Sequence, residues 1–222
     1  DDISDITYLN GSFFTTNYDL SGNAGNQIDL ISFSLNENGS FIDDSFHLDI
    51  NGQGYLSITN DGSDIYMQSR STQLLFKFSS VGEIAYARYD SIDTKWMPSG
   101  ISYHSSSDSL IMLYRNIHKN SEYRLRLLSK DIDQSSNKDV SFEVLDIDTT
   151  NHGIYSLSYF DSVLYMLAVR DNEDVLITMN YEDLSIISTE MIGDSTVMGI
   201  AIHNNLIYFS YRDRRIQKFR DL

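Results

Sequence analysis

The chain has 222 residues, with 32 acidic against 16 basic side chains, a single Pro and no Cys. Its formal net charge of −16 disfavours nucleic acids and anionic membranes as partners, and the lack of Cys excludes disulfides, thiol catalysis and Cys-ligated metals. No apolar run reaches the roughly 18 residues that a membrane-spanning helix needs, and the 15 Tyr and 11 Phe favour strands over helices.

One phrase occurs five times along the chain: an apolar strand, a turn of Asn, Asp, Ser or Gly, and a second apolar strand. Its copies begin at Asp5, Gly54, Gly100, Gly153 and Gly199, which are 46 to 53 residues apart. A period of this size with several strands per unit is typical of β-propeller blades. We therefore predict one all-β domain over residues 1–222, a five-bladed β-propeller of four-stranded antiparallel blades. The predicted blades span about 1–50, 51–92, 93–148, 149–193 and 194–222.

Turn residues and apolar runs place the strands within each blade. The first two blades are predicted to hold strands at 6–9, 13–18, 28–35, 41–50, 55–59, 65–70, 74–78 and 83–89. The third blade has longer connections before its outer strands at 123–128 and 140–147, and the fourth has strands at 154–159, 163–170, 175–180 and 184–191. The fifth shows only 200–203, 206–212 and 216–219. Because an open edge strand invites mispairing, we expect a three-stranded last blade or one completed by neighbouring sequence, in a chain excised from a longer protein.

The residues that open the repeats argue against an enzyme. Five-bladed propellers of this size include glycosidases of the arabinanase type, which need two carboxylates about 5 to 9.5 Å apart, set on separate blades. Only Asp5 is acidic among the five opening residues. No Gly-x-Ser-x-Gly motif occurs, and no metal-ligand spacing links the five histidines, His47, His104, His118, His152 and His203. His104 and His203 share one repeat position, which we interpret as a polar cap at a blade end.

Three acidic pairs have a spacing that suits calcium, namely Asp131 with Asp133, Asp146 with Asp148, and Asp171 with Asp174. None matches a full calcium-binding loop with its Gly and final Glu. We predict solvated turns and no cofactor, and we keep calcium as the alternative.

Arginine recurs at the end of the second strand in four blades, as Arg70, Arg115, Arg170 and Arg212. We expect these guanidinium groups to project toward one face, where they can hold phosphate or carboxylate groups bidentately. The alternative is that each arginine bridges acidic loop residues and fastens neighbouring blades together.

Two further residues are predicted on the same face. Trp96 stands in the link between the second and third blades, where an exposed indole suits a sugar ring or an apolar partner residue. Packing beneath its own loop is the alternative. His152 directly precedes Gly153 at the start of the fourth blade.

In repeat number and length the chain resembles five-bladed propellers such as tachylectin-type lectins and the propeller modules of siphophage receptor-binding proteins, some of which bind wall teichoic acid. This resemblance implies a non-enzymatic recognition module, extracellular or on a cell or virion surface, that binds a glycan or an anionic polymer. The predicted site consists of Arg70, Arg115, Arg170, Arg212, Trp96 and His152. Two alternatives stay open: a structural propeller that docks protein subunits of a virion tail or surface assembly, and a glycosidase-like enzyme.

Overall fold

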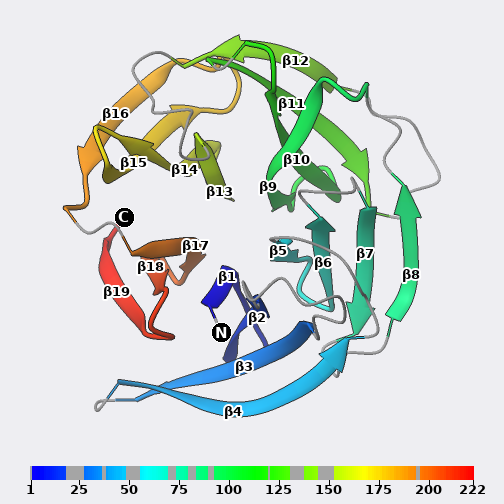
Figure 1. Ribbon diagram of the computed structural model, residues 1–222, viewed down its shortest axis with the longest axis vertical. Coiled ribbons are helices and arrows are strands. Elements are labelled where there is room, and N and C mark those ends of the chain that lie inside the picture. The colour runs from blue at the N-terminus through cyan, green and yellow to red at the C-terminus, as the bar shows by residue number, and fades with distance from the viewer. Residues whose placement is uncertain are drawn as a thin grey trace. The chain divides into compact units, whose positions relative to one another are not determined.

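The computed structural model describes residues 2–18, 28–36, 39–48, 56–69, 74–79, 84–89, 93–119, 121–130, 138–144, 153–193 and 196–222. These residues form an all-β five-bladed propeller, with four antiparallel sheets of four strands and a last sheet of three (Figure 1). They contain no helix of the length and hydropathy needed to cross a membrane. The predicted fold class is confirmed, including the three-stranded form of the last blade.

Two compact units make up the chain. The first, Asp1–Asp90 together with Thr196–Leu222, contains blades 1, 2 and 5. Blade 1 consists of β1 (Asp2–Leu9), β2 (Ser12–Tyr18), β3 (Ile28–Asn36) and β4 (Gly39–Leu48). Blade 2 consists of β5 (Leu56–Asn60), β6 (Asp64–Ser69), β7 (Leu74–Ser79) and β8 (Ile84–Tyr89), and blade 5 of β17 (Val197–His203), β18 (Leu206–Tyr211) and β19 (Ile216–Asp221).

The second unit, Ser91–Ser195, contains blades 3 and 4. Blade 3 consists of β9 (Trp96–His104), β10 (Ser109–Asn116), β11 (Glu122–Ser129) and β12 (Lys138–Glu143). Blade 4 consists of β13 (Ile154–Phe160), β14 (Val163–Arg170), β15 (Glu173–Asn180) and β16 (Ile186–Met191). Every predicted strand is present, although β9 begins at Trp96 and therefore includes part of the predicted link.

Tight turns with positive φ connect the first two strands of several blades. In blade 1 the turn is Asn10–Gly11, with φ of 52° and 95°, as the sequence predicts. Asn204 and Asn205 take φ of 50° and 60° in the matching turn of blade 5. Asparagine tolerates this conformation better than most residues, so the turn residues fix where each hairpin reverses.

The hydrophobic core lies between neighbouring blades. In the first unit, Leu9 and Phe14 of blade 1 pack with Ile58 and Phe78 of blade 2, and Phe13 of blade 1 belongs to a second cluster shared with blade 5. A third cluster joins blades 3 and 4 in the second unit, and its members come from both blades: Ile111, Leu113, Tyr123, Leu125, Val144, Ile154, Leu157, Leu164, Met166, Ala168, Val175, Ile177, Met179 and Tyr181. Burial of each large apolar side chain contributes about 1.5 to 3 kcal/mol, so the contacts between blades carry much of the stability of each unit.

Two glycines allow the first strands of neighbouring blades to approach closely. A Cβ atom on Gly100 of β9 would lie 2.8 Å from the Leu157 Cβ of β13, and one on Gly199 of β17 would lie 2.7 Å from the Asp5 Cα of β1. The backbone runs so close at both places that no side chain fits. Figure 1 shows β17, β1 and β5 side by side in the first unit.

The strand register corrects one detail of the sequence alignment. Gly100 pairs with Leu113 and Gly199 pairs with Ser210, in each case four residues into the second strand. In blade 4 the corresponding residue is Ser156, which pairs with Leu167, four residues into β14. Gly153 therefore precedes the strand and does not open it at the equivalent position.

Hydrogen bonds also join the first strands of neighbouring blades. Asn60 at the end of β5 donates its amide N–H to Thr7 Oγ1 at 2.6 Å and to the Tyr8 carbonyl at 2.8 Å. In the second unit, the Tyr159 N–H donates to Ser102 Oγ at 2.8 Å. Buried polar groups at these positions are paired across the blade boundary, which fixes the register of one blade against the next.

His104 and His203 end the first strands of blades 3 and 5, so the predicted shared repeat position is confirmed. Each imidazole stacks on a tyrosine of the adjoining first strand: His104 on Tyr159, with ring centroids 4.5 Å apart, and His203 on Tyr8 at 3.6 Å. The buried His104 also accepts the Ser107 N–H at Nδ1. These histidines therefore join neighbouring blades as well as closing a strand end.

We predict that replacing Gly100 with Ala lowers the free energy of unfolding by about 1 to 3 kcal/mol, because the new methyl group collides with Leu157. Urea unfolding of Gly100→Ala measures the effect. Ser105→Ala, in an exposed turn of the same hairpin, is the control and is expected to change stability by no more than about 0.5 kcal/mol. Equal stability of the two variants would contradict the close approach.

The stack of His203 on Tyr8 predicts a pH dependence. Burial lowers the His203 pKa below its ordinary value of 6.5, so the unfolded chain binds more protons than the folded one between the two pKa values. Stability therefore rises with pH through that window and is lost as the pH falls below 6.5. Thermal melts at several pH values should show a smaller drop for His203→Phe, which keeps a stacked ring, than for the unaltered protein. Identical pH profiles would contradict this role.

Candidate binding site

The structure describes four of the six residues in the predicted site. Arg70 and His152 lie outside the described residues. Arg115 and Arg170, in the second unit, are half-buried, Arg212 is exposed in the first unit, and Trp96 is buried. The four described residues thus differ in exposure and fall in two separate units.

Arg115 near the end of β10 packs against the beginning of blade 4. A Cβ atom on Gly153 would lie 3.3 Å from the Arg115 Cδ and 2.5 Å from the Tyr123 hydroxyl, so the arginine stem and the phenol cover this glycine. Gly153 has a φ of 63°, a conformation that side chains disfavour. The Ile154 N–H donates to the Tyr123 hydroxyl at 3.2 Å. The surroundings of Arg115 favour the interpretation that it fastens two blades.

The same contact affects the pKa of the Tyr123 hydroxyl. Burial raises the pKa of its hydroxyl, and the Ile154 hydrogen bond and the positive charge of Arg115 oppose that rise. The guanidinium of Arg115 also contacts Met97, with Nη2 3.9 Å from Sδ. Arg115 is thus in contact with two residues of its own blade and with the start of the next.

Two of the three described arginines share one repeat position. Arg115 lies six residues after Ser109, and Arg212 lies six residues after Leu206, where Ser109 and Leu206 are the first residues of β10 and β18. Arg170 lies seven residues after Val163, the first residue of β14, so its side chain leaves the strand on the opposite side. The prediction of equivalent positions therefore holds for Arg115 and Arg212 and is wrong for Arg170.

Trp96 is the clearest correction to the predicted site. It is 2% exposed on β9, so it offers no surface on which a sugar ring can stack. The Arg124 guanidinium lies over its ring at 4.8 Å, and Arg124 Nε contacts Asp139 Oδ1 at 2.8 Å. The indole is packed within blade 3 beneath Arg124 of β11, so the prediction of an exposed indole is wrong.

The acidic candidates have structural surroundings. Asp5 is 1% exposed and its Oδ1 accepts the Ile6 N–H at 3.0 Å. Asp174 is buried and accepts the Tyr155 hydroxyl at 2.9 Å, whereas Asp171 is exposed in the preceding turn. The other two predicted calcium pairs lie outside the described residues, and within the described ranges no three His, Cys, Asp or Glu side chains gather as a metal site.

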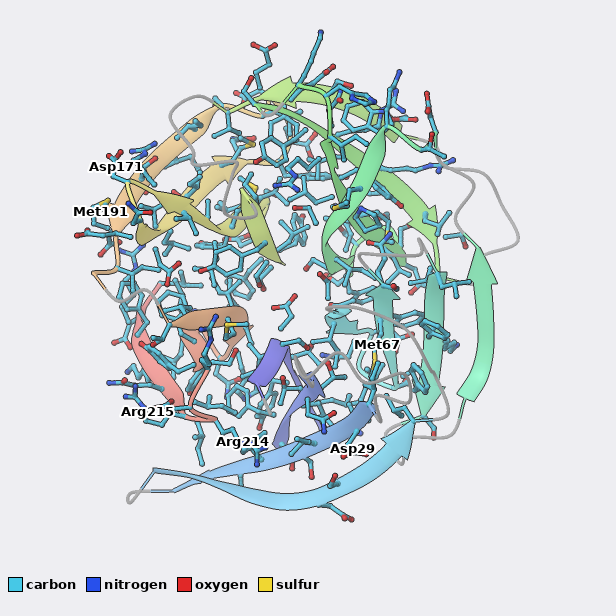
Figure 2. All side chains as sticks on the ribbon, in the orientation of Figure 1. Asp29, Met67, Asp171, Met191, Arg214 and Arg215 are labelled. Carbon is cyan, nitrogen blue, oxygen red and sulfur yellow. The ribbon has the colours of Figure 1, made fainter. Side chains whose placement is uncertain are left out.

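The densest group of basic residues lies in a segment from which the comparison of blades selected only Arg212. Five of the 16 basic residues fall within positions 212–220, in the turn after β18 and in β19: Arg212, Arg214, Arg215, Lys218 and Arg220. We call Arg212, Arg214 and Arg215 the basic turn. Figure 2 shows Arg214 and Arg215 beside β19. A count of charges along the sequence would have found this segment.

Aromatic rings and carboxylates hold the basic turn in place. The Arg215 guanidinium lies over the Tyr211 ring at 4.7 Å, and its Nε contacts Asp213 Oδ2 at 2.6 Å. Arg212 donates its backbone N–H to the Thr196 carbonyl. The Arg215 side chain remains 55% exposed, so it is held in position and accessible to a partner.

Comparisons with known proteins agree with the fold class and give no family. No protein-family model and no curated protein sequence matches the chain. Among solved structures, a nidogen/laminin complex chain is 12% identical, with a TM-score of 0.55, and the match covers 94% of this chain and 72% of that one. At this identity the likeness shows the β-propeller fold alone.

Two other solved structures are similar at a lower score. Streptogramin B lyase is 12% identical with a TM-score of 0.47, over 98% of this chain and 65% of the other. The PQQ-bound aldose sugar dehydrogenase from Streptomyces coelicolor is 9% identical with a TM-score of 0.49, over 94% and 75%. None of the three is described as a lectin, so the finer likeness to lectins stays a prediction.

We predict that Arg115→Ala lowers the free energy of unfolding by about 1 to 2 kcal/mol, because the side chain no longer covers Gly153 and Tyr123. Arg212→Ala is the control, since this exposed side chain is expected to contribute no more than about 0.5 kcal/mol. Denaturant unfolding of both variants gives the comparison. If Arg115→Ala is as stable as Arg212→Ala, Arg115 does not fasten the blades.

Proposed function

We propose that this protein is a non-enzymatic recognition module of a cell or virion surface that binds a charged glycan or another anionic polymer through the basic turn. The observation that carries this proposal is the charge distribution. Residues 212–222 hold five basic and two acidic side chains, whereas residues 1–211 hold eleven basic and thirty acidic ones. Cations concentrated on one blade of an acidic protein favour a specific anionic partner over general attraction to polyanions.

The exposure of the basic turn supports this role. Arg212 and Arg215 are exposed and Arg214 is half-buried. The ion pair of Arg215 with Asp213 is itself exposed, and exposed pairs contribute only about 0 to 1 kcal/mol. A phosphate or carboxylate of a ligand can therefore replace Asp213, and the planar guanidinium binds either group bidentately.

The surroundings of Asp5 support a non-enzymatic reading. A glycosidase needs a pair of carboxylates that reach the substrate. Asp5, the acidic residue that opens the first repeat, is almost fully buried against the position where Gly199 has no side chain. Its carboxylate accepts a backbone N–H, which suits a structural role at the boundary of blades 1 and 5.

A second candidate function is the docking of protein subunits. It is favoured by β16, where Ile186, Ile187 and Met191 are 49%, 57% and 47% exposed. Figure 2 shows Met191 on this strand. Exposed apolar side chains on one strand are typical of contacts with another protein, so this candidate predicts a partner on blade 4.

We predict that a glycan array supplemented with polyphosphate shows binding that weakens between about 50 and about 300 mM NaCl, because salt screens the contacts. The double variant Arg214→Glu with Arg215→Glu should bind about tenfold more weakly, since each reversal replaces an attraction with a repulsion. Lys95→Glu with Lys119→Glu is the control, because these exposed lysines of the second unit give the same change in net charge. If both double variants bind the polymers equally weakly, only the total charge of the protein matters. If no polymer binds at all, the result favours the docking of protein subunits.

A further inference from the structure

Strand β19 forms the outer edge of its sheet in the described part of blade 5. The sheet order there is β17-β18-β19, whereas in each of the other four blades a fourth strand follows the third. Strand β4 of blade 1 comes close to β19, but no strand pairing joins the two among the described residues. An open edge presents a row of backbone N–H and C=O groups to solvent.

The side chains of β19 differ from those of other third strands. In β15 the six residues Asp174–Met179 are all buried, whereas in β19 only Ile216 is buried and Gln217 and Lys218 are exposed. The charged residues of β19 are Lys218, Arg220 and Asp221. A strand of this kind is suited to pair with an added strand of opposite charge, because opposite charges on paired strands stabilise the pairing.

Blade 3 shows how this protein pairs a basic third strand. Its third strand, β11, carries Arg124 and Arg126, and the fourth strand, β12, places Asp139 opposite Arg126. Asp139 Oδ1 also lies 2.8 Å from Arg124 Nε. An acidic residue of the fourth strand therefore lies against two arginines of the third.

The register places Arg220 on the corresponding face of blade 5. Arg220 pairs with Ile207, which lies one residue after the start of β18. In blade 3, the partners of Arg126 and Arg124 lie three and five residues after the start of β10. Each partner lies an odd number of residues from the start of its strand, so the three arginine side chains leave the sheet on the same face of their blades. A bulge at Phe219 interrupts the alternation, so Lys218 pairs with Tyr208, the residue next to Ile207, and lies on the other face.

We propose that an extended acidic segment of a partner protein adds to the edge of β19 as the fourth strand of blade 5. Its backbone pairs with the open edge, and its carboxylates approach Arg220 on one face and Lys218 on the other. This inference goes beyond the proposed function, because it uses the strand and not the basic turn. A polypeptide is favoured over a polysaccharide since only a second strand matches the repeating donors and acceptors of the edge.

The local contacts of β19 allow an added strand to replace them. Lys218 Nζ contacts Asp221 Oδ1 at 2.5 Å, with the two side chains 50% and 73% exposed, and the Arg220 guanidinium lies 5.7 Å from the Phe219 ring. An ion pair this exposed is weak, so a carboxylate of the added strand can take the place of Asp221. The same cations repel a basic strand, which makes the edge selective.

The test uses an eight-residue synthetic peptide of alternating Thr and Glu, and the same peptide with every second backbone nitrogen methylated so that one edge has no N–H donors. We expect the first peptide to bind, the methylated peptide to bind at least tenfold more weakly, and hydrogen exchange to slow at amides of β19. Lys218→Glu with Arg220→Glu should weaken binding of the first peptide about tenfold. The double variant Lys95→Glu with Lys119→Glu is the control, because its net charge changes by the same amount, and it should bind the first peptide as the unaltered protein does.

Equal binding of the two peptides, or protection of amides outside β19, would overturn strand addition, because both measurements use the unaltered protein. If equal peptide binding accompanies polymer binding through Arg214 and Arg215, the proposed function stands and strand addition is wrong. If the peptide binds as expected and no polymer does, strand addition stands and the polymer proposal is wrong. If Lys218 and Arg220 only keep other strands away from the edge, neither peptide binds and the double variant self-associates, which also overturns the inference.

Discussion

The close approach of neighbouring first strands is the constraint on which the rest of the structure depends. At Gly100 and Gly199 the adjoining strand leaves no room for a Cβ atom. Once the backbones are this near, polar groups along the boundary must pair with each other, as Asn60 does with Thr7. Stacks such as His203 on Tyr8 then extend the contact to the strand ends. The first strands are thus fixed by packing, and the outer strands are the place where sequence and charge can vary.

The sequence predicts the fold well because its signals are local. Apolar alternation and turn residues such as Asn10–Gly11 define each hairpin without knowledge of other blades. The misplaced residue, Gly153, shows the limit of that approach. The register places Ser156, three residues later, at the position of Gly100 and Gly199, and nothing in the local pattern marks it. A matching letter in two repeats therefore does not ensure a matching position in two strands.

The candidate site is less predictable because it depends on contacts between distant residues. The sequence leaves open whether Arg115 faces a ligand or fastens blades, and in the structure the side chain covers Gly153, 38 residues further along the chain. The sequence places Trp96 on a link, whereas it lies within β9 beneath Arg124. The error at Trp96 comes from inferring exposure from its place between two repeats, whereas exposure depends on which element packs above a residue. The clustering of cations after Tyr211 needed no such knowledge, since neighbours in sequence are also neighbours in a hairpin.

The acidic body of the protein limits what its basic segment can bind. Thirty acidic residues precede position 212, and their combined field repels any polyanion that approaches from a distance. At physiological ionic strength that field decays over about 8 Å, so a negative ligand is attracted only when it reaches the cations themselves. Long-range steering is therefore weak, and affinity must come from contacts made at short range. The contacts that we propose are bidentate guanidinium bonds at the turn and backbone pairing along β19, where Arg220 and Lys218 lie on opposite faces. A partner that combines negative charge with an ordered, repeating backbone would make both kinds of contact, whereas a flexible polyanion would make only the first.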